Sequence, residues 1–117
     1  MKDLKLRTKQ FAVDCWFLCS KIPHSREYNA YVNQLLRSSS SVGANYRASQ
    51  RGKSTADFIN KLKIVEEETD ESMYFLELLM EVYGKETEKL KLLHSEASEI
   101  LAIIVASINT ARRNQKG

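Results

Sequence analysis

Apolar residues recur every three or four positions along almost the whole chain, the spacing of one buried face on an α-helix. The longest series, over residues 55–83, predicts a helix whose core positions are Phe58, Leu62, Val65, Thr69, Ser72, Leu76, Leu79 and Tyr83. Shorter series predict helices over residues 4–21, 26–50 and 86–113. Their core positions are Phe11, Cys15, Leu18 and Ile22, then Tyr28, Val32, Leu35, Ser39, Val42 and Tyr46, then Leu90, Leu93, Ala97, Ile100, Ile104, Ser107 and Ala111.

Residues that start and stop helices stand between these series. Pro23 has no N–H and disfavours helix at the residue before it, so it ends the first helix. Ser25 is a suitable N-cap for the second helix, and Ser54 or Thr55 for the third. Gly84 is expected to end the third helix in the left-handed conformation.

Four amphipathic helices with short connections predict an all-α fold, an elongated up-down-up-down antiparallel four-helix bundle in which residues 1–117 form one domain. The small residues of segment 38–44, Ser-Ser-Ser-Ser-Val-Gly-Ala, allow two interpretations. They are a Ser-rich loop, or they let another helix approach closely. The unbroken heptad on both sides favours the second interpretation.

Several apolar residues lie outside the predicted core stripes. The third helix has Ile64, Phe75 and Leu78 beside its stripe, the first adds Val13, Trp16 and Phe17, and the fourth adds Leu92, Leu101, Ile103 and Ile108. Monomers rarely expose so much apolar surface, so we expect a homo-oligomer of cyclic form. The alternative is that a broad stripe widens the core of a single bundle.

Charge is unevenly distributed, although the net charge is only +3. Residues 1–53 hold ten Lys and Arg against three Asp and Glu, and residues 54–111 hold five against twelve. In an up-down bundle the cations of residues 1–9, 51–53 and 112–116 are expected to meet at one pole and to bind phosphate backbones without reading bases. The candidate nucleic-acid-binding residues are Arg37, Arg47, Arg51, Lys53, Arg112, Arg113 and Lys116.

Catalytic chemistry has little support. Cys15 and Cys19 lie one helical turn apart, but a structural zinc site needs four ligands. The acidic run from Glu66 to Glu71 has no Glu-x-x-His motif nearby, and the four serines lie in no nucleophile elbow. We therefore expect no enzymatic activity, cofactor or metal, and we keep a carboxylate metal enzyme as a distant alternative.

The location expected from the sequence is the cytoplasm. The start of the chain has no apolar signal region, and the charge-free stretch Ile100–Ala111 is too short to span a bilayer.

Residues 35–79 resemble the bacterial four helix bundle protein family. That family includes proteins encoded in intervening sequences of 23S ribosomal RNA genes, called S23, and is related to the accessory variability determinant of diversity-generating retroelements. The matching positions are Arg37, Ser41, Val42, Asn45, Ser54, Phe58 and Glu71. The chain departs from the family pattern at Ala48-Ser49, where many members have Glu-Gly, and at the acidic run Glu66–Glu68.

The resemblance implies a homopentameric ring. From the retroelement relative it implies a basic surface for RNA or DNA and a reverse transcriptase partner. The subunit interface is expected to use Ile64, Glu68, Glu71, Phe75 and Leu78. Arg37 or Arg47 is expected to pair with Glu68 or Glu71, within or between subunits. The alternative function is a structural or protein-interaction scaffold without a nucleic-acid role.

Overall fold

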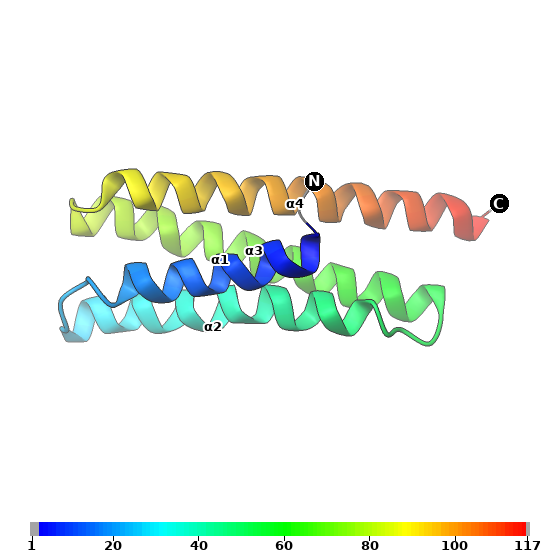
Figure 1. Ribbon diagram of the computed structural model, residues 1–117, viewed down its shortest axis with the longest axis horizontal. Coiled ribbons are helices and arrows are strands. Elements are labelled where there is room, and N and C mark those ends of the chain that lie inside the picture. Colours follow the sequence, from blue (N-terminus) through cyan, green and yellow to red (C-terminus); the bar gives the residue numbers. More distant parts are fainter. Residues whose placement is uncertain (1–2, 117) are drawn as a thin grey trace.

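Four helices account for nearly all of residues 3–116, the part of the chain that this computed structural model describes. They are α1 (Leu4–Cys19), α2 (Arg26–Ser49), α3 (Thr55–Tyr83) and α4 (Thr87–Lys116). Each helix runs antiparallel to the next, and α4 returns beside α1, so that α1 and α3 lie on opposite corners (Figure 1). The molecule measures 51 × 24 × 20 Å. The prediction of an elongated all-α four-helix bundle is confirmed.

Local signals in the sequence set the helix boundaries. The Ser25 hydroxyl accepts a hydrogen bond from the Tyr28 N–H at 2.9 Å, and the Ser54 hydroxyl accepts one from the Asp57 N–H at 3.1 Å. These bonds satisfy N–H groups that have no partner inside the helix. Gly84 ends α3 with a φ of 70°, as predicted. The first helix ends at Cys19, two residues earlier than predicted, and Ile22 beyond it is still buried in the core.

The core follows the predicted stripes closely. All four predicted positions of α1 and six of the eight in α3 are buried. The other two positions of α3, Phe58 and Tyr83, are partly buried and pack against the core. The register shifts near the end of α4, where Ile108 is buried and Ser107 is only half-buried. The spacing there is four residues twice in succession, because a straight helix drifts relative to a strict seven-residue repeat.

Segment 38–44 is helical and lets α1 approach α2 closely, so the loop interpretation is wrong. Gly43 is buried, and a Cβ atom placed on it would lie 3.3 Å from the Thr8 Oγ1 and 3.4 Å from the Thr8 carbonyl carbon. On the other side of α2, Ser38 accepts a hydrogen bond from the Ser72 hydroxyl of α3 at 2.9 Å. Small side chains on α2 therefore bring it close to both of its neighbours.

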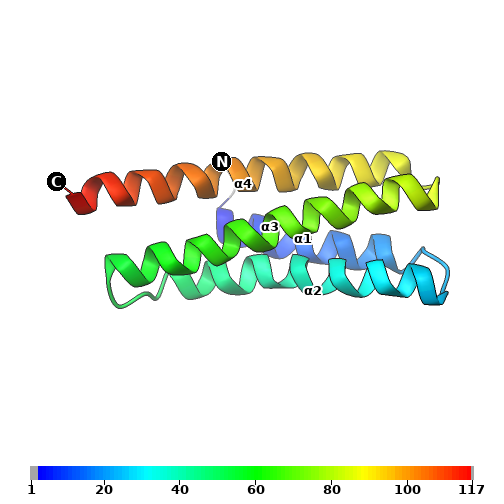
Figure 2. The ribbon, with the colours of Figure 1, turned by 180° about the vertical axis from the view of Figure 1, so that it is seen from behind.

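Helix α1 is much shorter than its neighbour α4. Its 16 residues span about 24 Å, whereas the 30 residues of α4 span about 45 Å. Since α1 ends beside the start of α2, it begins only part of the way along the bundle (Figures 1 and 2). Beyond the start of α1 the bundle consists of three helices. Partly buried apolar side chains near this point pack against the core: Leu4, Tyr46, Phe58 and Ala111.

Helix α4 is long and apolar enough over Thr87–Gln115 to cross a membrane by length and composition alone, with a mean hydropathy of 1.3 in its most apolar window. Core helices of bundles pass the same test. Within that window 28% of the helix is buried. This share is close to the two residues in every seven that face the partner helices in a coiled-coil-like bundle. Contacts with α1 and α3 bury Ile100, Ile104 and Ile108, whereas Leu92 and Ile103 remain exposed.

Candidate nucleic-acid interface

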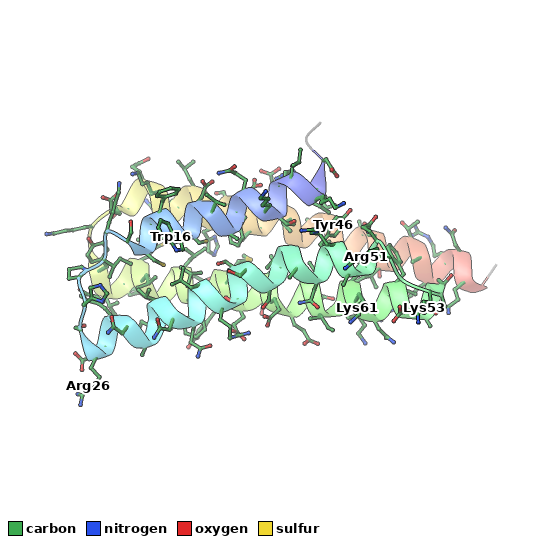
Figure 3. The ribbon with its side chains drawn as sticks, turned by 60° about the horizontal axis from the view of Figure 1, so that its bottom comes forward. Trp16, Arg26, Tyr46, Arg51, Lys53 and Lys61 are labelled. Carbon is green, nitrogen blue, oxygen red and sulfur yellow. The ribbon has the colours of Figure 1, made fainter. Side chains whose placement is uncertain are left out.

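Exposed cationic side chains gather at the end of the bundle where α2 ends, α3 begins and α4 ends (Figure 3). We call this group the basic end, and it consists of Arg47, Arg51, Lys53, Arg112 and Arg113. Among residues 3–116, none of the five forms an ion pair with a carboxylate. The nearby Asp57 carboxylate accepts the backbone N–H of Lys53 at 3.2 Å and so stabilises the loop. The basic end therefore keeps its positive charge available.

Arg37 lies apart from the basic end, in the middle of α2. Its guanidinium donates to the Glu68 carboxylate at 2.9 Å and also to the Glu71 carboxylate, both on α3. The expected pairing of Arg37 with these acids is thus present within one chain. Because two carboxylates neutralise it, Arg37 contributes little to a positive surface. Glu68 and Glu71 are already paired within the subunit and do not need a second subunit as a partner.

The start of α1 reaches Arg47, with which Lys5 and Lys9 line one hollow, but it does not reach Arg112 and Arg113 at the end of α4. The expected meeting of residues 1–9 with residues 51–53 and 112–116 at one pole is therefore wrong for the described residues 3–9. Arg7 lies beside the middle of α4, where its guanidinium donates to both Glu96 oxygens at 2.9 and 2.7 Å and to Glu99 at 3.4 Å. The hydrogen bonds to Glu96 raise the pKa of Arg7. The reason is length, since α1 is about 14 residues shorter than α4. Lys2 and the side chain of Lys116 lie outside the described residues.

The acidic run of α3 is divided between two sides of the helix. Glu68 and Glu71 face α2 and pair with Arg37. Glu66, Glu67 and Asp70 line a shallow hollow on the side toward α4, together with Lys63, Leu101 and Val105. The acidic run therefore faces both neighbours of α3 and is not one continuous negative surface.

Two apolar faces lie on opposite corners of the bundle. The α3 face consists of the exposed or half-buried residues Ile64, Tyr74, Phe75, Leu78 and Val82. The α1 face consists of Leu6, Val13 and Phe17 together with Leu92 of α4, which are 62%, 37%, 58% and 68% exposed. Ile108, expected outside the core, is buried within it. The other apolar residues that were predicted to lie outside the core stripes are exposed or half-buried on the surface of the bundle.

Cys15 and Cys19 are free thiols buried in the core. Within residues 3–116, no three His, Cys, Asp or Glu side chains come together in a group that could hold a metal ion. Burial raises the pKa of Cys15 to about 12 and that of Cys19 to about 11. Since the thiolate is the reactive form, both cysteines are unreactive near neutral pH in the folded protein.

These pKa values predict how thiol reactivity and stability depend on pH. At pH 8 iodoacetamide should alkylate neither cysteine in the folded protein and both in urea, as mass spectrometry would show. Well below pH 9 both thiols are mostly neutral in either state, and only the unfolded chain has a small thiolate fraction at pH 8 that can be alkylated. Above pH 9 the unfolded chain releases its thiol protons first, so the free energy of unfolding should fall from pH 9 toward pH 12. Rapid alkylation of the native protein at pH 8 would contradict this.

A feature that the sequence interpretation missed is a groove between α1 and α2. It has one hollow lined by Lys5, Lys9 and Arg47 and a second lined by Trp16. A signal for it is present in the sequence, because Lys5, Lys9 and Trp16 stand at positions i, i+4 and i+11 of one helix and so share a face. Because Trp16 is apolar, the sequence-based prediction grouped it with the apolar residues outside the core stripes and not with the two lysines.

Comparisons with known proteins match this chain to one family. The family model described as 23S rRNA-intervening sequence protein matches residues 3–106. The chain is also similar to a solved crystal structure from Bacteroides thetaiotaomicron VPI-5482, described as a protein with unknown function from the S23 ribosomal protein family. The two are 32% identical with a TM-score of 0.83, and the similarity covers 91% of this chain and 98% of the other. No curated protein matches.

Proposed function

Because this chain belongs to the 23S rRNA-intervening sequence protein family, we propose that it is a non-enzymatic oligomeric protein that binds the backbone of RNA or DNA through its basic end. The observation that carries the proposal is the gathering of five exposed cations without carboxylate partners among residues 3–116. Arg7 and Arg37, by contrast, are paired with carboxylates.

Electrostatics favours a phosphate backbone as the ligand of the basic end. Lys and Arg side chains that contact phosphates release condensed counterions, which drives binding without any reading of sequence. Arg112 and Arg113 lie in the last turns of α4, where they also offset the partial negative charge of the helix terminus. A single subunit offers few such contacts, so strong binding would need the basic end repeated several times.

The two apolar faces support assembly into a ring. They differ in composition and lie on opposite corners of the bundle, so a contact between them joins unlike surfaces of neighbouring subunits. Heterologous contacts of this kind generate closed rings when the rotation between subunits closes. A ring would repeat the basic end around one axis. The family resemblance implies five subunits, and the related retroelement protein suggests a reverse transcriptase as a partner.

The test of the proposed function is the salt dependence of RNA binding. The triple variant Arg51→Ala/Arg112→Ala/Arg113→Ala should bind generic RNA more weakly. Its slope of log K against log salt concentration should fall by about one for each phosphate that a subunit no longer neutralises. Fluorescence anisotropy of a labelled RNA at several salt concentrations measures both quantities.

A matched control removes three cations from other parts of the surface. Arg26 lies at the opposite end of the bundle (Figure 3), and Lys85 and Lys91 are exposed. The variant Arg26→Ala/Lys85→Ala/Lys91→Ala changes the net charge equally and should leave the slope nearly unchanged. An equal reduction in both variants would mean that binding follows overall charge and not the basic end.

The second candidate function is a scaffold for protein interactions, favoured by the exposed apolar side chains of the α1 and α3 faces. A wild-type oligomer that binds no RNA or DNA even at low salt would support the scaffold and reject the nucleic-acid role.

A further inference from the structure

The groove between α1 and α2 begins with a cationic hollow. It has a volume of about 440 Å³, and Lys5, Lys9 and Arg47 line it. Its floor is made of small side chains, Thr8, Ala12, Ser40, Gly43 and Ala44. No Asp or Glu lines it, and none of its three cations forms an ion pair among residues 3–116. The hollow is therefore suited to an anion.

A second hollow of about 340 Å³ lies between the same two helices, nearer the other end of the bundle. Trp16 lines it from α1, and Asn29 and Asn33 line it from α2, while His24 adds a ring from the loop between the helices. The indole is 58% exposed, and its labelled position in Figure 3 lies on the side where α1 meets α2. This section offers an aromatic surface beside amide and imidazole hydrogen-bonding groups, and no carboxylate lines it.

The two hollows lie in line. Lys5, Lys9 and Trp16 share one face of α1, and at 1.5 Å per residue Trp16 lies about 10 Å from Lys9 and about 16 Å from Lys5 along the helix axis. Arg47 of α2 lies opposite Lys5 because the two helices are antiparallel. Arg51, labelled in Figure 3, stands four residues after Arg47, in the connection that follows α2. Arg47 therefore belongs both to the groove and to the basic end.

We propose that a segment of single-stranded nucleic acid lies along the α1–α2 groove, with its phosphates on Lys5, Lys9 and Arg47 and one base stacked on Trp16. The proposal rests on the proposed function and gives the form of nucleic acid that the protein takes. A cationic track combined with an exposed aromatic ring is the combination by which proteins hold single strands without sequence preference. A duplex keeps its bases stacked on each other and cannot offer a base face to Trp16.

The test uses the fluorescence of Trp16, which is the sole tryptophan of the chain. An oligo(U) strand of about 12 nucleotides is titrated into the wild-type protein, and an RNA duplex of the same length is titrated in parallel. Stacking should quench the Trp16 emission with oligo(U) and leave it nearly unchanged with the duplex. Trp16→Ala should weaken oligo(U) binding about tenfold, and Trp16→Phe should keep most of the affinity.

Charge reversal tests the phosphate section. Lys5→Glu/Lys9→Glu should weaken oligo(U) binding at least tenfold and reduce its salt dependence. The control Lys61→Glu/Lys63→Glu carries the same change on α3, outside the groove. Circular dichroism checks that each variant keeps its helix content.

Each outcome decides for or against the groove. If RNA binds through Arg51, Arg112 and Arg113 while the Trp16 emission and the Lys5/Lys9 variant are unaffected, the groove proposal fails and the proposed function stands. If neither RNA form binds, and single-stranded and duplex DNA of the same length do not bind either, both proposals fail. If poly-Glu quenches Trp16 and displaces oligo(U) with equal strength, the groove takes acidic segments in general and the single-strand proposal is overturned.

Discussion

Gly43→Leu is expected to lower the free energy of unfolding by about 3 kcal/mol, because it forces α1 away from α2. The position has no room, since even a Cβ atom would lie 3.3 Å from the Thr8 Oγ1. A leucine side chain must displace the α1 backbone or adopt a strained rotamer. Small domains have only about 5–15 kcal/mol of stability in total, so the change should shift the urea unfolding midpoint strongly.

Two variants separate close packing from other causes. Ala44→Leu places the same side chain on the next residue, which is exposed, and should change stability by less than about 0.5 kcal/mol. Gly43→Ala combines a gain of about 1 kcal/mol in helix propensity with a contact that Thr8 must relax by a few tenths of an ångström, so its net effect should be small. A Gly43→Leu protein as stable as Ala44→Leu would show that the close approach is not structurally important.

Ile64→Glu/Leu78→Glu is expected to convert the proposed oligomer into monomers of 13.4 kDa. Burying an apolar side chain of this size contributes about 1.5–3 kcal/mol, and an unpaired carboxylate in its place opposes association in addition. Both residues lie on the α3 face, and Ile64 is 37% exposed, so the folded subunit should tolerate the change. Size-exclusion chromatography with light scattering gives the mass directly.

The matched control places two glutamates outside both apolar faces. Ala102 and Ala106 are exposed on α4, and Ala102→Glu/Ala106→Glu should leave the assembly intact. A wild-type protein that elutes as a monomer at every concentration would reject the ring. A double α3-face variant that still assembles would move the interface to a different surface.

The helices could be predicted from the sequence because each has a complete local signal. In α3, buried residues recur every three or four positions, and Ser54 and Gly84 mark its two ends. The series is Leu62, Val65, Thr69, Ser72, Leu76 and Leu79. The serine-rich segment of α2 is harder to interpret. Ser38 has low helix propensity, but it is buried against Ser72 of α3. Because Ser72 stands 34 residues later in the sequence, no local signal indicates this contact.

The candidate site could be predicted less well, because its members depend on how far each helix reaches. Arg51 and Arg112 come to the same end, as expected, whereas Arg7 is held at the middle of α4 by Glu96. The first helix is already shorter than the fourth in the sequence-based prediction. This difference argues against placing residues 1–9 at the same end of the bundle as residues 112–116. Side-chain pairing is the other gap, since nothing local indicates that Arg37 has two carboxylate partners.

The burial of Cys15 and Cys19 makes distance measurements on an assembled protein simpler. Both thiols can stay in place because they do not react near neutral pH, so the core is left unaltered. A cysteine introduced at the exposed position Ala102 would then take up a fluorophore or spin label selectively. Spacings between labels on neighbouring subunits would report the symmetry of the assembly in solution.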